Sequence, residues 1–142
     1  MKNFKKLVLL FLVASTTLVS CNKDDDSSSG SIEGSWEFSK VGTIIAGEEF
    51  LVDYDHTPGC NKDYTEIIAG GTLKDHYFED NGSGCEEGID NGTWSRSGNN
   101  ITVNFNGDVS IAEILELSST TLKLKATDSD TGEVYLSVAI RK

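Results

Sequence analysis

The chain has 142 residues and a formal net charge of −11 at pH 7, from 23 acidic residues against 12 lysines and arginines. This length suits a single domain and leaves no room for a second catalytic lobe. The acidic balance argues against a nucleic-acid partner, because a phosphate backbone requires a basic surface. All of the acidic residues lie after residue 20, so the average conceals a basic, apolar N-terminal segment and a strongly acidic remainder.

The first 20 residues have the pattern of an export signal. Lys2, Lys5 and Lys6 precede an uninterrupted run of apolar and small residues over positions 7–19. This run is too short for a membrane-spanning helix, which needs about 20 apolar residues, and it fits the apolar core of a signal peptide. We therefore expect residues 1–20 to be a signal peptide.

Cys21 follows this run directly, after the sequence Leu-Val-Ser at positions 18–20. A small residue and then a cysteine at the end of a signal peptide resembles the lipobox of bacterial lipoproteins. The resemblance implies that residues 1–20 are removed and that Cys21 carries the lipid. Two or more acyl chains hold a protein firmly on a membrane. The alternative is an ordinary secretory signal with an incidental cysteine.

Residues 21–31 form a polar connection to the rest of the chain. Positions 22–26 read Asn-Lys-Asp-Asp-Asp and positions 27–31 read Ser-Ser-Ser-Gly-Ser. With no apolar side chain to bury, this stretch is expected to be a flexible tether. The Lys-Asp-Asp sequence also resembles the export signal that places lipoproteins of Bacteroidetes on the cell surface. This resemblance implies an outer-membrane location with surface exposure, the periplasmic face of that membrane being the alternative.

Residues 32–142 are expected to form one all-β domain. Short runs of alternating apolar and polar residues are separated by turns rich in glycine and asparagine. The turns recur mostly at intervals of about 9 to 16 residues, which is typical of an antiparallel up-and-down meander. About eight strands in this length must hide their edges, so we predict a small β-barrel, with a β-sandwich as the alternative.

The segment over residues 41–61 lacks this alternation. It is expected to form one irregular strand and then a long loop that leads to Cys60. Apart from Cys21, which is expected to carry lipid, the chain contains Cys60 and Cys85. Two cysteines in an exported chain are typically bridged. We predict this disulfide, with two free surface thiols as the alternative. Neither His56 nor His76 has a zinc-ligand spacing from these cysteines, so no metal site is expected.

Three later runs show period-two alternation most clearly. We expect the apolar face of each run to point into the core, because alternate side chains of a strand share one face. Their apolar positions are, in chain order, Ile101, Val103 and Phe105; Leu122, Leu124 and Ala126; and Val134, Leu136, Val138 and Ile140.

The first and the last strand of the expected barrel each carry a recognisable feature. Gly34-Ser35-Trp36 opens the first strand and Arg141 ends the last. A Gly-x-Trp motif at this place resembles the first strand of lipocalins, and residues 32–142 resemble the small lipocalin-like domains of Bacteroidetes lipoproteins. The resemblance implies that Trp36 closes the floor of the barrel against Arg141, with Gly34 beside them. It also implies that the barrel binds a small or hydrophobic molecule.

A run near position 113 suggests a buried acid. Val109, Ile111, Glu113 and Leu115 share one face in period two. If that face points inward, Glu113 is a carboxylate among apolar side chains, and perturbed acids of this kind often mark binding sites. The alternative is a β-bulge near residue 112, which would turn Glu113 to solvent.

The run over residues 73–79 mixes polar and apolar side chains on both faces. This pattern fits a strand that lines a polar cavity, and it also fits an exposed edge hairpin. We predict that Asp75 and Tyr77 from this run approach Trp94 and Glu113 inside the barrel and bind the ligand there.

The sequence contains no nucleophile elbow, phosphate-binding loop or zinc-protease motif. We therefore expect no enzymatic activity, no cofactor and no metal. The predicted function is that of a monomeric, lipid-anchored module that binds a small or hydrophobic molecule in the cell envelope. The alternative is a structural module whose barrel is filled with side chains and whose surface meets a protein or a glycan. An interior cavity with converging polar groups would favour the first.

Overall fold

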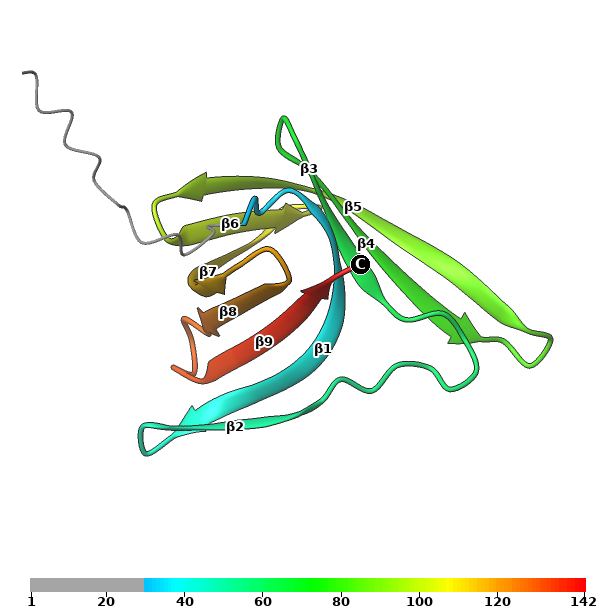
Figure 1. Ribbon diagram of the computed structural model, residues 1–142, viewed down its shortest axis with the longest axis horizontal. Coiled ribbons are helices and arrows are strands. Elements are labelled where there is room, and N and C mark those ends of the chain that lie inside the picture. Colours follow the sequence, from blue (N-terminus) through cyan, green and yellow to red (C-terminus); the bar gives the residue numbers. More distant parts are fainter. Residues whose placement is uncertain (1–29) are drawn as a thin grey trace, which may run out of the picture.

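The computed structural model describes residues 30–142, which form one curled β-sheet (Figure 1). The expected signal peptide, Cys21 and residues 22–29 of the expected tether lie outside the described residues. In the part of the chain that is described, no helix is long and apolar enough to cross a membrane. The nine strands are β1 (Gly34–Ile45), β2 (Glu48–Asp53), β3 (Tyr64–Ile68), β4 (Thr72–Asp80), β5 (Cys85–Ser97), β6 (Asn100–Phe105), β7 (Asp108–Leu117), β8 (Thr121–Thr127) and β9 (Val134–Arg141).

The strands β3 to β9 pair in sequence order, and β9 returns to pair with β1. This pairing closes eight strands into an antiparallel barrel, with β2 as one additional strand beside β1. Closure removes the free edges that an open sheet would expose. The predicted up-and-down β-barrel is therefore confirmed, and the β-sandwich alternative is wrong.

The first strand, β1, is long, and one of its edges pairs with two different strands. Residues 34–37 pair with β3, whereas residues 40–45 pair with β2. The turn between β1 and β2 is Ala46-Gly47, and both residues have positive φ, 53° and 88°. The prediction of one irregular strand and a loop over residues 41–61 is thus wrong in its first half, which forms a hairpin. Alanine rarely adopts positive φ, so this turn carries no hairpin signal in the sequence.

The expected apolar positions of β6 line the cavity, and so do Leu122 and Leu124 of β8, whereas Ala126 does not. In β9 the cavity is lined by Ser137 and Ala139 and not by the expected face, on which Ile140 is 41% exposed although Leu136 is only 2% exposed. The end of the strand explains this register. Arg141 packs on Trp36 in the barrel, and side chains on one face of a strand recur at every second residue. The inward face of β9 therefore carries small side chains.

A tryptophan and an arginine close one end of the barrel. Trp36 is 1% exposed, and its Nε1–H donates to the carbonyl oxygen of Ile32 at 2.7 Å. The guanidinium carbon of Arg141 lies 3.9 Å from the centroid of the Trp36 ring. Its Nη1 and Nη2 groups donate to the carbonyl oxygens of Glu33 and Ser31 at 2.7 and 2.6 Å. The last strand is thus joined to the segment that precedes the first.

Gly34 lies beside this contact. Its φ is +133°, and a Cβ atom at this position would stand 2.1 Å from Nη1 of Arg141. Any other residue would therefore strain the backbone and displace the guanidinium group. Gly34, Trp36 and Arg141 all lie at this end of the barrel.

A disulfide between Cys60 and Cys85 holds the segment that connects β2 to β3, as predicted. It joins this segment to the start of β5, with a Cα–Cα distance of 5.5 Å. The backbone N–H of Phe78 in β4 donates to the Asp63 carboxylate at 2.9 Å, and the Thr57 hydroxyl donates to the carbonyl oxygen of Phe78 at 2.5 Å. The segment is thereby fixed to β4, where the β4–β5 hairpin extends beyond the barrel wall (Figure 1).

Candidate functional site

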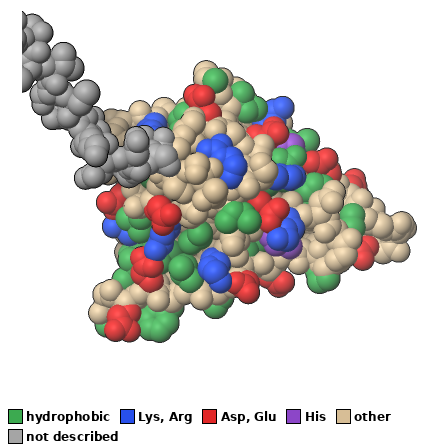
Figure 2. Space-filling model, in the orientation of Figure 1, with side chains coloured by type: hydrophobic (Ala, Val, Ile, Leu, Met, Phe, Trp, Pro, Cys, Tyr) green, Lys and Arg blue, Asp and Glu red, His purple; other side chains and the backbone are tan. Residues whose placement is uncertain are grey.

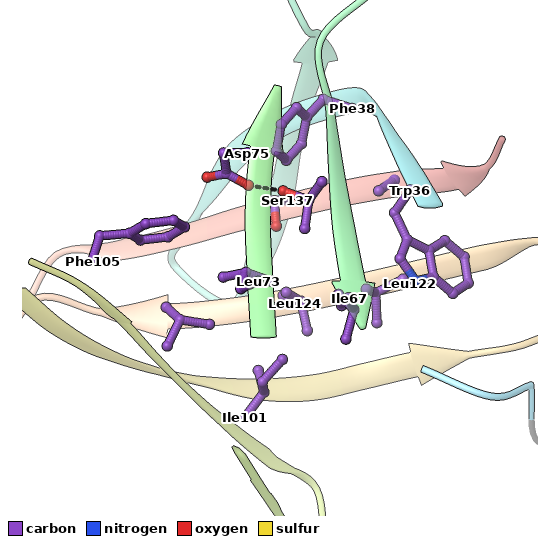
Figure 3. Close-up of a pocket in the computed structure, with 13 residues that line it drawn as sticks. Trp36, Phe38, Ile67, Leu73, Asp75, Ile101, Phe105, Leu122, Leu124 and Ser137 are labelled. Atoms are coloured by element: carbon purple, nitrogen blue, oxygen red, sulfur yellow. Dashed lines mark hydrogen bonds between the residues drawn. The ribbon is translucent and has the colours of Figure 1, made fainter. Parts of the chain in front are cut away.

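The barrel contains a partly open cavity of about 200 Å³ (Figure 3). Most of the side chains that line it are apolar, and they come from six strands of the wall. Figure 3 shows Trp36 at one end of the cavity and Phe105 at the other. The lining residues are Trp36, Phe38, Thr65, Ile67, Leu73, Asp75, Ile101, Val103, Phe105, Leu122, Leu124, Ser137 and Ala139.

Among the described residues, the polar side chains that line the cavity are Thr65, Asp75 and Ser137. Thr65 and Asp75 are direct cross-strand partners on β3 and β4, which places their side chains within reach of each other. The Thr65 hydroxyl donates a hydrogen bond to the Asp75 carboxylate. Ser137, on β9, is the third polar residue of the lining. Thr65 and Asp75 therefore form a polar wall in a cavity whose lining is otherwise mostly apolar.

Asp75 is the ionisable residue of this wall. Burial raises the pKa of its carboxyl group above the ordinary value. The hydrogen bond from Thr65 and the nearby His76 oppose this rise in pKa, and repulsion from Asp90 on β5 adds to it. Among residues 30–142, no ion pair includes Asp75. Its charge is therefore partly desolvated and lacks a cationic partner in the described part of the chain.

Glu113 lies outside the cavity, contrary to the prediction. Its carboxylate pairs with Nζ of Lys125 at 2.5 Å, and the glutamate side chain is 45% exposed. The next residue, Ile114, is 7% exposed and belongs to the core. A bulge in the pairing of β7 with β8 lies between Ile114 and Glu116, two residues later than the bulge weighed from the sequence. The inward face of β7 therefore consists of the alternate positions that include Ser110 and Ile114, and Val109 lies on the outward face.

Tyr77 and Trp94 also lie outside the cavity. Tyr77 shares a face with Asp75, but the hairpin has left the barrel wall at this point, so the ring packs over Gly88 and is 39% exposed. Trp94 packs against the edge of the core, and its Nε1–H donates to the carbonyl oxygen of Ile68 at 2.8 Å. Of the four residues predicted to meet inside the barrel, only Asp75 lines the cavity.

The other polar residues of the cavity, Thr65 and Ser137, were not among the predicted site residues. Thr65 lies in a short strand, β3, where five residues offer too few positions for a clear alternation. Ser137 interrupts an apolar run in β9 and reads as a solvent-facing residue. The signal that could have found both is the contact of Arg141 with Trp36, because it fixes which face of β9 is inward.

The outer face of the same strands carries a second polar cluster. His76 is buried, with Nδ1 2.7 Å from Oε1 of Glu87 and Nε2 3.4 Å from Oε2 of Glu66. Its ring stacks on Tyr64 at a centroid distance of 4.2 Å, and Nζ of Lys142 lies 3.4 Å from the centroid of Tyr64. These contacts cover the outside of β4. Within residues 30–142, no group of three or more His, Cys, Asp or Glu side chains could hold a metal ion.

On the face of the molecule drawn in Figure 2, the surface charges are mixed. Acidic and basic side chains are interspersed there, with apolar side chains between them. Several of the lysines form ion pairs with acidic neighbours, as Lys40 does with Asp53 at 2.6 Å and Lys62 with Glu37 at 2.8 Å. Exposed pairs of this kind contribute little to stability. The barrel cavity is therefore the candidate functional site.

Comparison with known proteins agrees with this architecture. A family model described as a lipocalin-like domain matches residues 32–124. A lipocalin-like protein from Bacteroides uniformis has a similar structure, with a TM-score of 0.58 and 12% sequence identity, over 80% of this chain and 100% of that one. An uncharacterized protein from Bacteroides eggerthii is similar with a TM-score of 0.51 and 12% identity, over 78% of this chain and 98% of that one. No curated protein matches the sequence.

Proposed function

The chain belongs to the lipocalin-like domain family, and on this premise we propose that it binds a small, mainly apolar molecule in the cavity of its barrel. The cavity carries the proposal, because small-molecule sites in proteins are concave and mostly apolar, with a few placed polar groups. Such sites usually measure about 300 to 1,000 Å³, so a cavity of about 200 Å³ favours a ligand with one ring or a short chain. The same cavity argues against the alternative of a barrel filled with side chains.

Binding would follow from the way in which the cavity is built. An apolar ligand that leaves water gains about 25 cal/mol for each Å² of buried apolar surface. The walls come from strands that pair around a closed barrel, so little conformational entropy is lost when the ligand enters. The polar wall would orient the ligand through hydrogen bonds. Nothing in this action requires a chemical step, and we propose a monomeric, non-catalytic binding protein.

A cavity-filling variant tests this function. Ala139 lines the cavity on β9, so Ala139→Leu would place a larger side chain inside it. We expect the wild-type protein to bind a small apolar fluorescent probe and Ala139→Leu to bind it at least about tenfold more weakly, because the ligand would lose both space and contacts. Fluorescence titration measures the affinity, and the melting temperature shows that the variant is folded.

Val138→Leu is the matched control. Val138 is the neighbour of Ala139 on the same strand and does not line the cavity. Its substitution enlarges a side chain on the opposite face, so the affinity should stay within about twofold of the wild-type value. If a folded Ala139→Leu protein binds the probe as well as the wild type does, the cavity is not the binding site.

We further propose that the protein is exported and anchored to the outer membrane through lipid on Cys21, with the barrel on the cell surface. The signal-like segment before Cys21 supports this location. A disulfide is also typical of an oxidising compartment outside the cytoplasm. The described chain enters the barrel at Ile32, next to the end closed by Trp36, so an anchor there would leave the other end of the cavity away from the tether.

The variant Cys21→Ser tests the anchor. We expect the wild-type protein in the membrane fraction of its host and the variant in the soluble fraction, because the thiol is the site of lipid attachment in the lipobox. Protease treatment of intact cells then separates the two faces of the outer membrane, since only a surface-exposed barrel is digested or released. A variant that stays in the membrane fraction would exclude lipidation of Cys21 as the anchor.

A further inference from the structure

The cavity has one feature that a site for purely apolar ligands would not need. Asp75 places a carboxylate in a cavity whose lining is mostly apolar, and burial of an ionisable group in such surroundings costs stability unless the charge is paired. Of the residues that the structure describes, no lysine, arginine or histidine lines the cavity. In residues 30–142, every side-chain ion pair of a lysine involves another acid, such as Glu113 or Asp53.

The hydrogen bonds of Asp75 leave room for a ligand. An ionised carboxylate can accept about four hydrogen bonds, and one comes from the Thr65 hydroxyl. The Ser137 hydroxyl is a further polar group in the lining of the same cavity. An ammonium group has three N–H donors and no acceptor, so it complements a wall that offers oxygen atoms.

From this wall we propose that the cavity selects small apolar amines, with the ammonium group paired to Asp75. The proposal rests on the binding function proposed above and names its ligand class. The cost of partly desolvating Asp75 falls on the empty protein, so an arriving cation gains the interaction with a carboxylate that is already in place. An anionic ligand would meet repulsion from Asp75 and from Asp90 next to it.

The other walls suit the same ligand class. Phe38 and Phe105 lie on either side of Asp75 in Figure 3, and aromatic rings attract a cation placed over their faces. On the opposite side, Ile67, Ile101 and Leu124 offer contacts to an apolar body. A cavity of about 200 Å³ limits that body to a single ring or a short chain.

Three probes of matched size test the proposal by isothermal titration calorimetry at neutral pH. They are 2-phenylethylamine, 2-phenylethanol and phenylacetate, which present a cation, a neutral hydroxyl and an anion on the same ring. We expect the amine to bind at least about tenfold more tightly than the alcohol, because hydrogen bonds between charged partners are roughly twice as strong as neutral ones. Phenylacetate should bind most weakly.

Two variants separate direct pairing from the general negative field of the protein. Asp75→Asn keeps the shape of the side chain and an acceptor for Thr65, so it should reduce amine affinity to that of the alcohol and leave alcohol affinity within about twofold. Asp90→Asn changes net charge equally at an exposed residue that does not line the cavity. It should keep most of the preference for the amine.

The outcomes distinguish this proposal from the function on which it rests. If the alcohol binds and the amine binds no better, or if phenylacetate binds best, the amine preference is wrong and the binding function stands. Equal losses in Asp75→Asn and Asp90→Asn would also overturn it, since a diffuse field would then explain the preference. If none of the three probes binds, both the amine preference and the cavity as a small-molecule site are wrong.

Discussion

Asp75 makes the stability of the empty barrel depend on pH. Because burial raises the pKa of its carboxyl group, the folded protein binds the proton more tightly than the unfolded chain does, where the pKa of an aspartate is about 3.9. The charged form is therefore unfavourable for folding above the raised pKa. This penalty disappears as the pH falls below the pKa of the unfolded chain, since both states are then protonated.

The variant Asp75→Asn should reveal this penalty. At pH 7 the neutral amide escapes the cost of a desolvated charge, so we expect the melting temperature to rise by about 2 to 6 °C, which is about 1 kcal/mol in a domain of this size. The difference from the wild type should shrink as the pH is lowered and vanish near pH 3.5, below the unfolded pKa of about 3.9. Thermal unfolding of both proteins across this pH range, without ligand, measures the effect.

Asp130→Asn provides the comparison, because Asp130 is exposed in the turn between β8 and β9 and is not among the charges that act on Asp75. Its substitution should change the melting temperature by less than about 2 °C at any pH in the series. If Asp75→Asn is instead less stable than the wild type at pH 7, the ionised carboxylate stabilises the fold, and the site does not hold an unpaired charge.

The four predicted site residues show what period-two alternation can and cannot provide. It correctly placed Asp75 and Tyr77 on one face of a strand, but it carries no information on where the hairpin leaves the barrel wall, and Tyr77 lies past that point. For Glu113 the alternation favours the wrong face, because Val109 and Ile111 share the face of Glu113 and are nevertheless exposed. The choice between the two faces depends on the pairing of β7 with β8 and on burial of Ile114, which are long-range contacts.

At the level of strands, the sequence was sufficient for the all-β class, the meander order and the disulfide, because turns and alternation are local signals. Which face of β9 points into the barrel could not be predicted from these local signals. Both of its faces contain apolar residues, and the packing of Arg141 on Trp36 selects the face with Ser137 and Ala139. The cavity exists partly because small side chains are turned inward at this point of the wall.

The hairpin of β1 and β2 illustrates a different limit. Its two-residue turn contains Ala46 at positive φ, a conformation that an L-residue with a side chain rarely adopts. Pairing of residues 40–45 with β2 holds the turn in place. The pattern of residues within 41–61 does not reveal this pairing between strands. Taken alone, that pattern therefore favours a loop.

Across the molecule as a whole, one cation contacts three parts of the closed barrel. Besides its stacking on Trp36 and its bonds to Ser31 and Glu33, Arg141 donates from Nε to the carbonyl oxygen of Ser119 at 3.4 Å. It thereby joins β9 to the segment before β1 and to the connection between β7 and β8. These parts of the chain are far apart in sequence and meet only in the closed barrel.

The variant Arg141→Lys tests this closure. Lysine keeps the charge but lacks the planar group with several N–H donors, so it can neither stack in the same way on Trp36 nor reach three carbonyl groups at once. We expect the free energy of unfolding to fall by about 1 to 3 kcal/mol, as measured by urea denaturation.

Arg96→Lys is the matched control. Arg96 is exposed, and within residues 30–142 its side chain bonds only to the nearby carbonyl of Gly98, so this substitution should change the free energy of unfolding by less than about 0.5 kcal/mol. Equal stabilities for the two variants would show that strand pairing between β1 and β9 closes the barrel without help from the guanidinium group. A selective loss in Arg141→Lys would instead place this side chain among the main determinants of closure.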